Sequence, residues 1–129
     1  MFDCAAFITA VLKQDRNDLR QFFAPDAVIQ WPCTNERFTV EEYLDANCLY
    51  PGKWTGTIEA VYRAAPVTVL VTKVWDEDRT ASFHCVSFVQ CRDDQIASLE
   101  EYWAEDGEPP MWRQEHKIGR PIRMGKETE

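Results

Sequence analysis

The stretch that decides the fold is VTVLVTKVWDEDRTASFHCVSFVQCRDDQIASLEEYW, residues 67–103. β-branched and aromatic residues fill three runs within it, and the two breaks between them are short polar clusters rich in aspartate. Such runs are typical of β-strands, and breaks this short favour hairpin connections. With a fourth run upstream, the pattern predicts an antiparallel meander of strands at 57–63, 67–75, 80–91 and 95–103.

Upstream of this meander the apolar residues recur at helical spacing. Asp3 can cap a helix that runs to about Leu12. Asn17 or Asp18 can begin a second, shorter helix. Residues 27–31 form an apolar run that ends at a proline, which is typical of a short strand.

A third helix is predicted by a capping box, in which Thr39 is followed three residues later by Glu42. We expect this helix to run to about Cys48, because a proline and a glycine follow soon after. Helices therefore come first and strands later along the chain. This order predicts an α+β fold, in which helices cover one face of a strongly curved, mostly antiparallel sheet.

Length and charge limit the class of protein. A chain of 129 residues and 15.0 kDa with 45% hydrophobic residues can bury one sizeable core. We predict a single domain over residues 1–112, followed by a basic tail over 113–129 with five basic and three acidic residues. The tail is either mobile or a strap across an acidic neighbour. The formal charge of -8 repels phosphate backbones and anionic lipids, so neither nucleic acid nor a membrane is an expected partner.

The five cysteines are odd in number and lack C-x-x-C spacing, which predicts neither a disulfide framework nor a zinc site. Reduced thiols are typical of a cytoplasmic protein. No apolar run is long enough to span a membrane, and the first residues lack the basic start of a signal peptide. We therefore expect a soluble, cytoplasmic protein that uses no metal and no cofactor.

Two short segments carry a resemblance to a known family. Residues 22–28 read FFAPDAV, and residues 101–107 read EYWAEDG. With the predicted order of elements, over about residues 3–112, they resemble the nuclear transport factor 2-like superfamily, and most closely its SnoaL-like branch. The resemblance implies a cone-shaped barrel that encloses a cavity. The superfamily contains isomerases, dehydratases, polyketide cyclases and binding modules, so the resemblance alone does not choose a function.

The ketosteroid isomerases share this fold, and the resemblance can be extended to them without gaps through the last hairpin. Their phenol donor then falls at Phe7, their carboxylate base at Trp31 and their oxyanion-hole carboxyl at Val86. None of these three side chains can abstract a proton or stabilise an enolate through a carboxyl or phenol group. We therefore expect that the chain is not a ketosteroid isomerase.

The same resemblance implies which strand residues face the cavity, because side chains alternate along a strand. The inward set is then His84, Val86 and Phe88 on one strand and Leu99, Glu101 and Trp103 on the next. A tight turn at residues 93–94 would pair Val86 with Glu101, and His84 with Trp103. His84 and Glu101 would then be diagonal neighbours on the cavity wall.

A histidine beside a carboxylate predicts an acid/base centre, since the carboxylate orients the imidazole. The main functional hypothesis is thus a small-molecule-binding cavity protein of the isomerase, dehydratase or cyclase type, with His84 and Glu101 as its catalytic pair. The alternative is a dimeric ligand-binding or scaffold module without chemistry, in which the two side chains only satisfy each other.

The expected ligand is a small apolar or aromatic molecule. Its predicted binding residues are Phe7, Trp31, Val86, Phe88, Leu99 and Trp103. Trp31 and Trp103 are expected to stack on a flat ligand, whereas for Phe7 and Phe88 core packing is the favoured interpretation. On the outward sheet face, the apolar residues Phe83, Val89, Ile96 and Tyr102 predict a homodimer.

Overall fold

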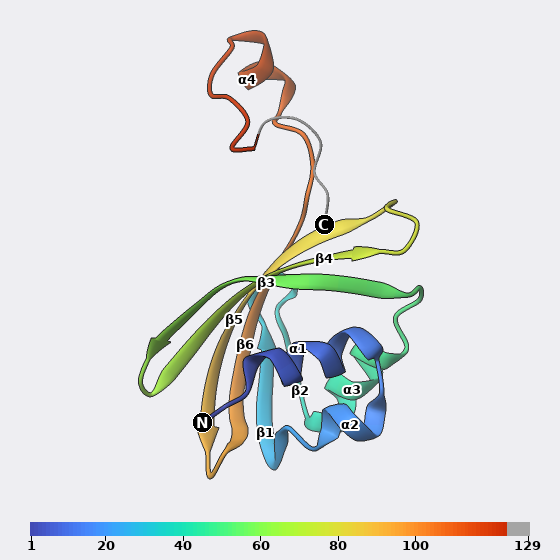
Figure 1. Cartoon of the computed structure of the whole chain (residues 1–129), viewed down its shortest axis with the longest axis vertical. Helices are drawn as coiled ribbons and strands as arrows, with labels where there is room; N and C mark the ends of the chain where they lie inside the picture. The colour runs from blue at the N-terminus through green and yellow to red at the C-terminus, as the bar shows by residue number, and fades with distance from the viewer. Residues whose placement is uncertain (124–129) are drawn as a thin grey trace.

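Six strands form one curved sheet, and three helices lie on one side of it (Figure 1). The computed structural model describes residues 1–123 of the chain. In chain order the elements are α1 (Cys4–Lys13), α2 (Arg16–Arg20), β1 (Phe23–Trp31), the 3-10 turn η1 (Pro32–Thr34), β2 (Glu36–Phe38), α3 (Val40–Cys48), β3 (Trp54–Ala64), β4 (Val67–Asp76), β5 (Ser82–Arg92), β6 (Gln95–Glu105) and α4 (Met111–Glu115). The α+β class predicted from the sequence is confirmed.

The predicted helix caps are present. The Asp3 carboxylate accepts a hydrogen bond from the backbone N–H of Ala6 at 3.0 Å and begins α1. The capping box of α3 is complete, because Thr39 and Glu42 each accept a hydrogen bond from the backbone N–H of the other. The second helix begins slightly earlier than predicted, with Asp15 as its N-cap.

The predicted meander is confirmed, with β3 to β6 pairing antiparallel in sequence order. The sheet order is β2-β1-β6-β5-β4-β3. Strand β1 lies parallel to β6, and the short strand β2, which the sequence analysis did not predict, covers the outer edge of β1. This parallel pairing brings Gln30, near the end of β1, opposite Glu100 in the middle of β6.

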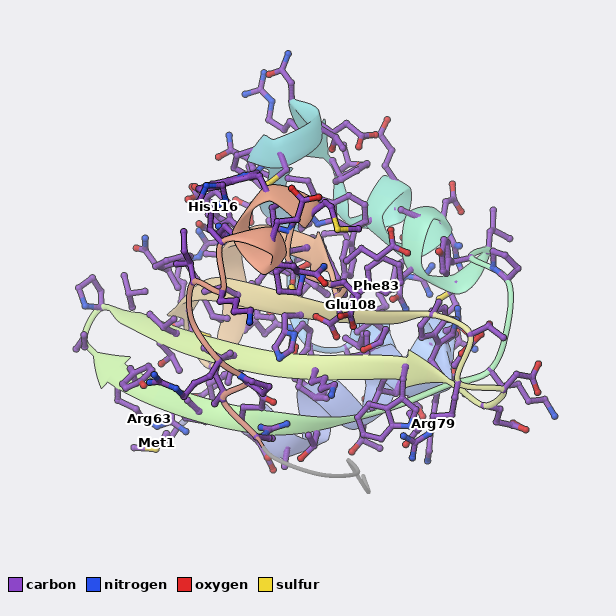
Figure 2. The ribbon with its side chains drawn as sticks, turned by 90° about the horizontal axis from the view of Figure 1, so that it is seen from above. Met1, Arg63, Arg79, Phe83, Glu108 and His116 are labelled. Atoms are coloured by element: carbon purple, nitrogen blue, oxygen red, sulfur yellow. The ribbon has the colours of Figure 1, made fainter. Side chains whose placement is uncertain are left out.

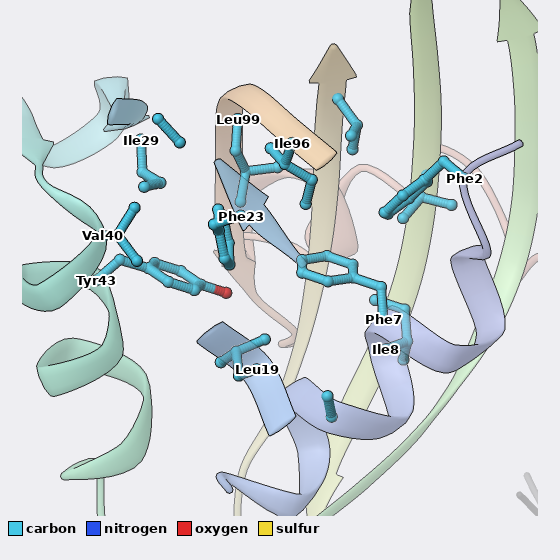
Figure 3. Close-up of a cluster of buried hydrophobic side chains, with 14 of the residues drawn as sticks. Phe2, Phe7, Ile8, Leu19, Phe23, Ile29, Val40, Tyr43, Ile96 and Leu99 are labelled. Atoms are coloured by element: carbon cyan, nitrogen blue, oxygen red, sulfur yellow. The ribbon is translucent and has the colours of Figure 1, made fainter. Parts of the chain in front are cut away.

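The core lies between the helices and the inner face of the sheet (Figure 3). Phe7 of α1 is fully buried there, against the rings of Phe2, Phe22 and Phe23. Leu99 of β6 is buried in the same cluster.

A β-bulge sets which side chains of β5 face the core. Next to the turn, Arg92 pairs with Gln95 and Cys91 with Ile96, as a tight turn requires. Ala97 is then skipped, so that Gln90 pairs with Ser98 and every later pair is displaced by one residue. A displacement of one residue turns the rest of the strand to the opposite face.

The predicted inward orientation of three β5 residues is therefore wrong. His84, Val86 and Phe88 lie on the outer face, where they pair with Ala104, Tyr102 and Glu100. The inner face of β5 carries Cys85, Ser87 and Val89 instead, all of them buried. For the same reason Phe83 and Val89 do not belong to the outward face, and Ile96 is buried in the core. The inward orientation predicted for Leu99, Glu101 and Trp103 on β6 is correct.

Beyond β6 the chain forms an arm, residues 106–123, whose helix α4 stands away from the sheet (Figure 1). Its residues are exposed throughout. Near its end Arg123 donates to Glu59 at 3.2 Å. The remaining part of the predicted basic tail, 124–129, lies outside the described residues. No helix in the described part of the chain has the length and apolar character needed to cross a membrane.

Candidate functional site

A cavity of about 300 Å³ opens between the inner face of the sheet and the ends of α1 and α3. Figure 2 shows the two ends of the sheet, with Arg79 in the β4–β5 turn at one end and Arg63 near the N-terminus at the other. The cavity lies toward the Arg79 end, because the end of β4 and the start of β5 line it. Its lining residues are Val11, Leu12, Gln14, Trp31, Cys33, Thr34, Tyr43, Ala46, Asn47, Tyr50, Trp54, Val74, Phe83, Glu101 and Trp103.

Six of these lining residues are aromatic, and their rings form a continuous series that we call the aromatic arc. In spatial order the arc consists of Tyr50, Trp54, Phe83, Trp103, Trp31 and Tyr43. Successive ring centroids lie 5.6 to 6.5 Å apart, and the ring planes are tilted by 42° to 84°. The three contacts from Phe83 through Trp103 and Trp31 to Tyr43 are edge to face, an arrangement that is favourable in itself.

Glu101 is the polar centre of the cavity, and its side chain is only 4% exposed. The indole N–H of Trp31 donates to one carboxylate oxygen at 3.2 Å, and the hydroxyl of Ser87 donates to the other at 2.7 Å. The indole nitrogen of Trp103 is buried and makes no hydrogen bond of good geometry within the described structure. Trp103 nevertheless lies close enough to Glu101 to favour its ionised form.

Burial raises the pKa of Glu101, because a carboxylate loses its hydration in an apolar site. Hydrogen bonds from Ser87 and Trp31, together with the nearby indole N–H of Trp103, oppose this rise without cancelling it. Burial also raises the pKa of the neighbouring Tyr43 and Cys85 side chains, and the charge of Glu101 adds to both shifts. The phenol and the thiol therefore stay protonated at neutral pH.

Among the described lining residues, Glu101 is the only aspartate or glutamate, and there is no lysine, arginine or histidine. Within residues 1–123, no cluster of three or more histidine, cysteine, aspartate or glutamate side chains could hold a metal ion. The chemistry of the site is therefore that of one carboxyl group and its hydrogen-bond donors inside an aromatic wall.

The structure brings together three of the residues predicted for the site, namely Trp31, Glu101 and Trp103. Phe7 and Leu99 lie in the core and do not line the cavity. Val86 and Phe88 point away from the cavity, because the bulge at Ala97 places them on the outer face.

His84 does not meet Glu101, and the predicted contact between them is wrong for the same reason. On the outer face its ring lies between two other carboxylates, with Nδ1 2.5 Å from Asp106 and Nε2 3.1 Å from Glu59. Its side chain is 39% exposed. Partial burial would raise the pKa of Asp106, but hydrogen bonds from Ser82 and His84 outweigh it and lower that pKa.

The sequence analysis did not identify several residues of the site. They are Tyr43, Tyr50, Trp54, Phe83 and Ser87. Tyr43 follows the capping box and shares a buried helix face with Val40 and Leu44, so helical spacing could have indicated it. Phe83 and Ser87 could be identified only if the bulge were known, because the bulge determines that their side chains lie on the inner face of the sheet.

No protein-family model matches the sequence, and no curated protein matches it significantly. Solved structures are similar along most of the chain. A candidate ketosteroid isomerase from Kribbella flavida has a TM-score of 0.75 at 24% identity, over 92% of this chain and 87% of its own. An NTF2-like protein from Burkholderia xenovorans has a TM-score of 0.73 at 16% identity. The match covers 92% of this chain and 91% of the B. xenovorans protein.

A third structure has a ketosteroid isomerase-like fold, comes from Catenulispora acidiphila and was solved in complex with trimethylamine. Its TM-score is 0.65 at 18% identity, over 78% of this chain and 83% of its own. Matches of this kind also include SnoaL-like polyketide cyclase candidates. The chain thus has the nuclear transport factor 2-like fold, in agreement with the resemblance seen in the sequence.

Proposed function

We propose that this protein binds a small organic molecule in its cavity, with the aromatic arc as the wall and Glu101 as the polar anchor. The observation that carries this proposal is a carboxylate buried on the floor of an open, aromatic-lined cavity. Burial of an ionisable group costs stability, and such groups occur preferentially at functional sites. A cavity of about 300 Å³ is at the small end of the range of ligand sites. Trimethylamine bound to the C. acidiphila relative supports the proposal.

A second candidate function is acid/base catalysis of an isomerisation, dehydration or cyclisation, with Glu101 as the proton-transferring residue. The raised pKa of Glu101 favours it, because a general acid or base works best when its pKa lies near the working pH. A single carboxyl group can take a proton from one atom of a substrate and return it to another. His84 has no part in this reaction, since it lies on the opposite face of the sheet.

We also propose that the protein does not catalyse ketosteroid isomerisation. Phe7 is buried in the core, and Trp31, at the position where the resemblance places the carboxylate base of the isomerases, offers an indole N–H. Val86 faces away from the cavity, and the neighbouring inward residues Cys85 and Ser87 are not carboxylic acids.

We also propose that the protein is a homodimer through the outer face of the sheet. The apolar residues of that face include Tyr62, Val69, Val71, Val86, Phe88 and Tyr102. Tyr62 is 60% exposed, and the rings of Phe88 and Tyr102 pack edge to face at 5.9 Å. Exposed rings on adjacent strands favour burial against a second copy of the same face. A cytoplasmic location stays a prediction.

The binding proposal can be tested by NMR, using the indole N–H signals of the tryptophans as reporters. Neutral, cationic and anionic fragments with six to twelve non-hydrogen atoms, roughly the size that such a cavity holds, are titrated one at a time. We expect at least one fragment to shift the signals of Trp31 and Trp103 while leaving Trp112 unchanged, because Trp112 lies on the exposed arm. The proposal fails if no fragment shifts Trp31 or Trp103.

A further inference from the structure

We infer that the ligand of this cavity is an organic cation, an amine in its ammonium form or a quaternary ammonium with small apolar substituents. The inference rests on the proposed binding function and names the ligand class for that site. Three features of the cavity carry it: the charge of the anchor, the nature of the wall and the absence of positive charge from the described lining.

The first feature is that Glu101 is surrounded by hydrogen-bond donors but has no counter-ion among the described residues that line the cavity. Trp31 and Ser87 occupy one position on each oxygen, and each carboxylate oxygen can accept a second hydrogen bond. Donors stabilise the ionised form, so the site is built around a negative charge. A buried negative charge is costly unless a positive charge compensates it, and none of the described lining residues supplies one.

The second feature is the aromatic arc. The face of an aromatic ring carries partial negative charge and attracts a cation within about 6 Å of the ring centroid, most strongly for tryptophan. Three of the six rings are tryptophans, and two of these, Trp31 and Trp103, lie beside the carboxylate. Because successive rings are tilted, they present faces and edges from several directions to one small volume.

The third feature is the charge outside the cavity. The chain carries a formal charge of -8, which raises the local concentration of cations and lowers that of anions. A carboxylate ligand would face Glu101 in the same apolar volume without a positive partner. A neutral ligand could fill the cavity but would leave the charge of Glu101 uncompensated.

The test uses three probes of nearly the same shape that differ in charge: choline, 3,3-dimethylbutan-1-ol and 3,3-dimethylbutanoate. Each is titrated into the full-length protein, and affinity is read from the indole N–H signals of Trp31 and Trp103. We expect choline to bind at least about tenfold more tightly than the neutral alcohol, as a desolvated cation–π contact and an ion pair together provide. The carboxylate should bind more weakly than the alcohol.

Two variants locate the effect. Glu101→Gln should weaken the preference for choline over the alcohol to the part that the aromatic rings supply, since the amide keeps the shape and removes the charge. Glu100→Gln is the matched control on the outer face of the same strand, and it should keep the full preference for choline. The affinity of the unaltered protein for choline should also rise with pH as Glu101 ionises, which tests the inference without any variant.

Equal binding of choline and the alcohol would overturn the cation inference and leave the binding proposal intact. Preference for the carboxylate would overturn it as well. If choline does not bind at all, the inference is wrong, and the binding proposal is then decided by the fragment titration described above.

Discussion

Replacing Glu101 with glutamine should change the stability of the protein in a pH-dependent way. The folded state raises the pKa of Glu101 through burial, while the unfolded chain titrates near the ordinary value of about 4.3. As the pH rises, the unfolded chain therefore loses its proton first. Between the two pKa values the folded protein loses about 1.4 kcal/mol of stability per pH unit through this one group.

Glutamine has nearly the same shape and does not titrate. It can still accept a hydrogen bond from Trp31 or Ser87 through its carbonyl oxygen, so the packing of the site is kept. The stability of Glu101→Gln relative to the unaltered protein should therefore increase with pH. The increase should begin near pH 4 and level off once the folded pKa of Glu101 is passed.

The measurement is urea denaturation of both proteins at half-unit steps from pH 4 to pH 9. Contributions from other carboxylates cancel in the difference, because both proteins carry them. Glu100→Gln, on the opposite face of β6, provides the baseline for removing one negative charge. A difference between Glu101→Gln and this baseline that does not depend on pH would refute the assignment of a raised pKa to Glu101.

Three further predictions follow from the same contacts. Glu41 accepts hydrogen bonds from two arginines, which lower its pKa to about 2, so its NMR titration midpoint should lie far below the usual 4.5. The ring NMR signals of His84 should not change in Glu101→Gln but should change in Asp106→Asn, because Asp106 contacts the ring whereas Glu101 lies on the opposite face of the sheet; a change in the first variant would contradict the described register. Light scattering should show a dimer for the unaltered protein and a 15.0 kDa monomer for Phe88→Asp, whereas a monomer in both cases would exclude the proposed outer-face dimer.

The fold could be predicted because its signals are local. A capping carboxylate at Asp3 and the box at Thr39 depend on residues only three apart, and the four long strands are separated by short polar turns. Strand β2 and the parallel pairing of β1 with β6 could not be predicted in this way. They join residues far apart in the chain and leave no pattern within either segment.

The site could be predicted in part. The bulge at Ala97 accounts for most of the residues that were predicted wrongly. The predicted inward orientation of the β6 side chains agrees with the structure, because the resemblance is anchored at Trp103, which lies close to Glu101 in the same strand. The predicted orientation of the β5 side chains depends on pairing residues across the β5–β6 hairpin without interruption. The bulge at Ala97 displaces this pairing by one residue. Alanine does not indicate a bulge as a glycine in the left-handed region does, so a regular hairpin predicts His84 beside Glu101.

A crystal structure of the protein grown with choline tests the central claim most directly. The account predicts one choline in the cavity, with its ammonium group against the rings of Trp31 and Trp103 and in contact with the carboxylate of Glu101. A cavity that contains only water, or that is closed by its own side chains at saturating choline, would contradict it.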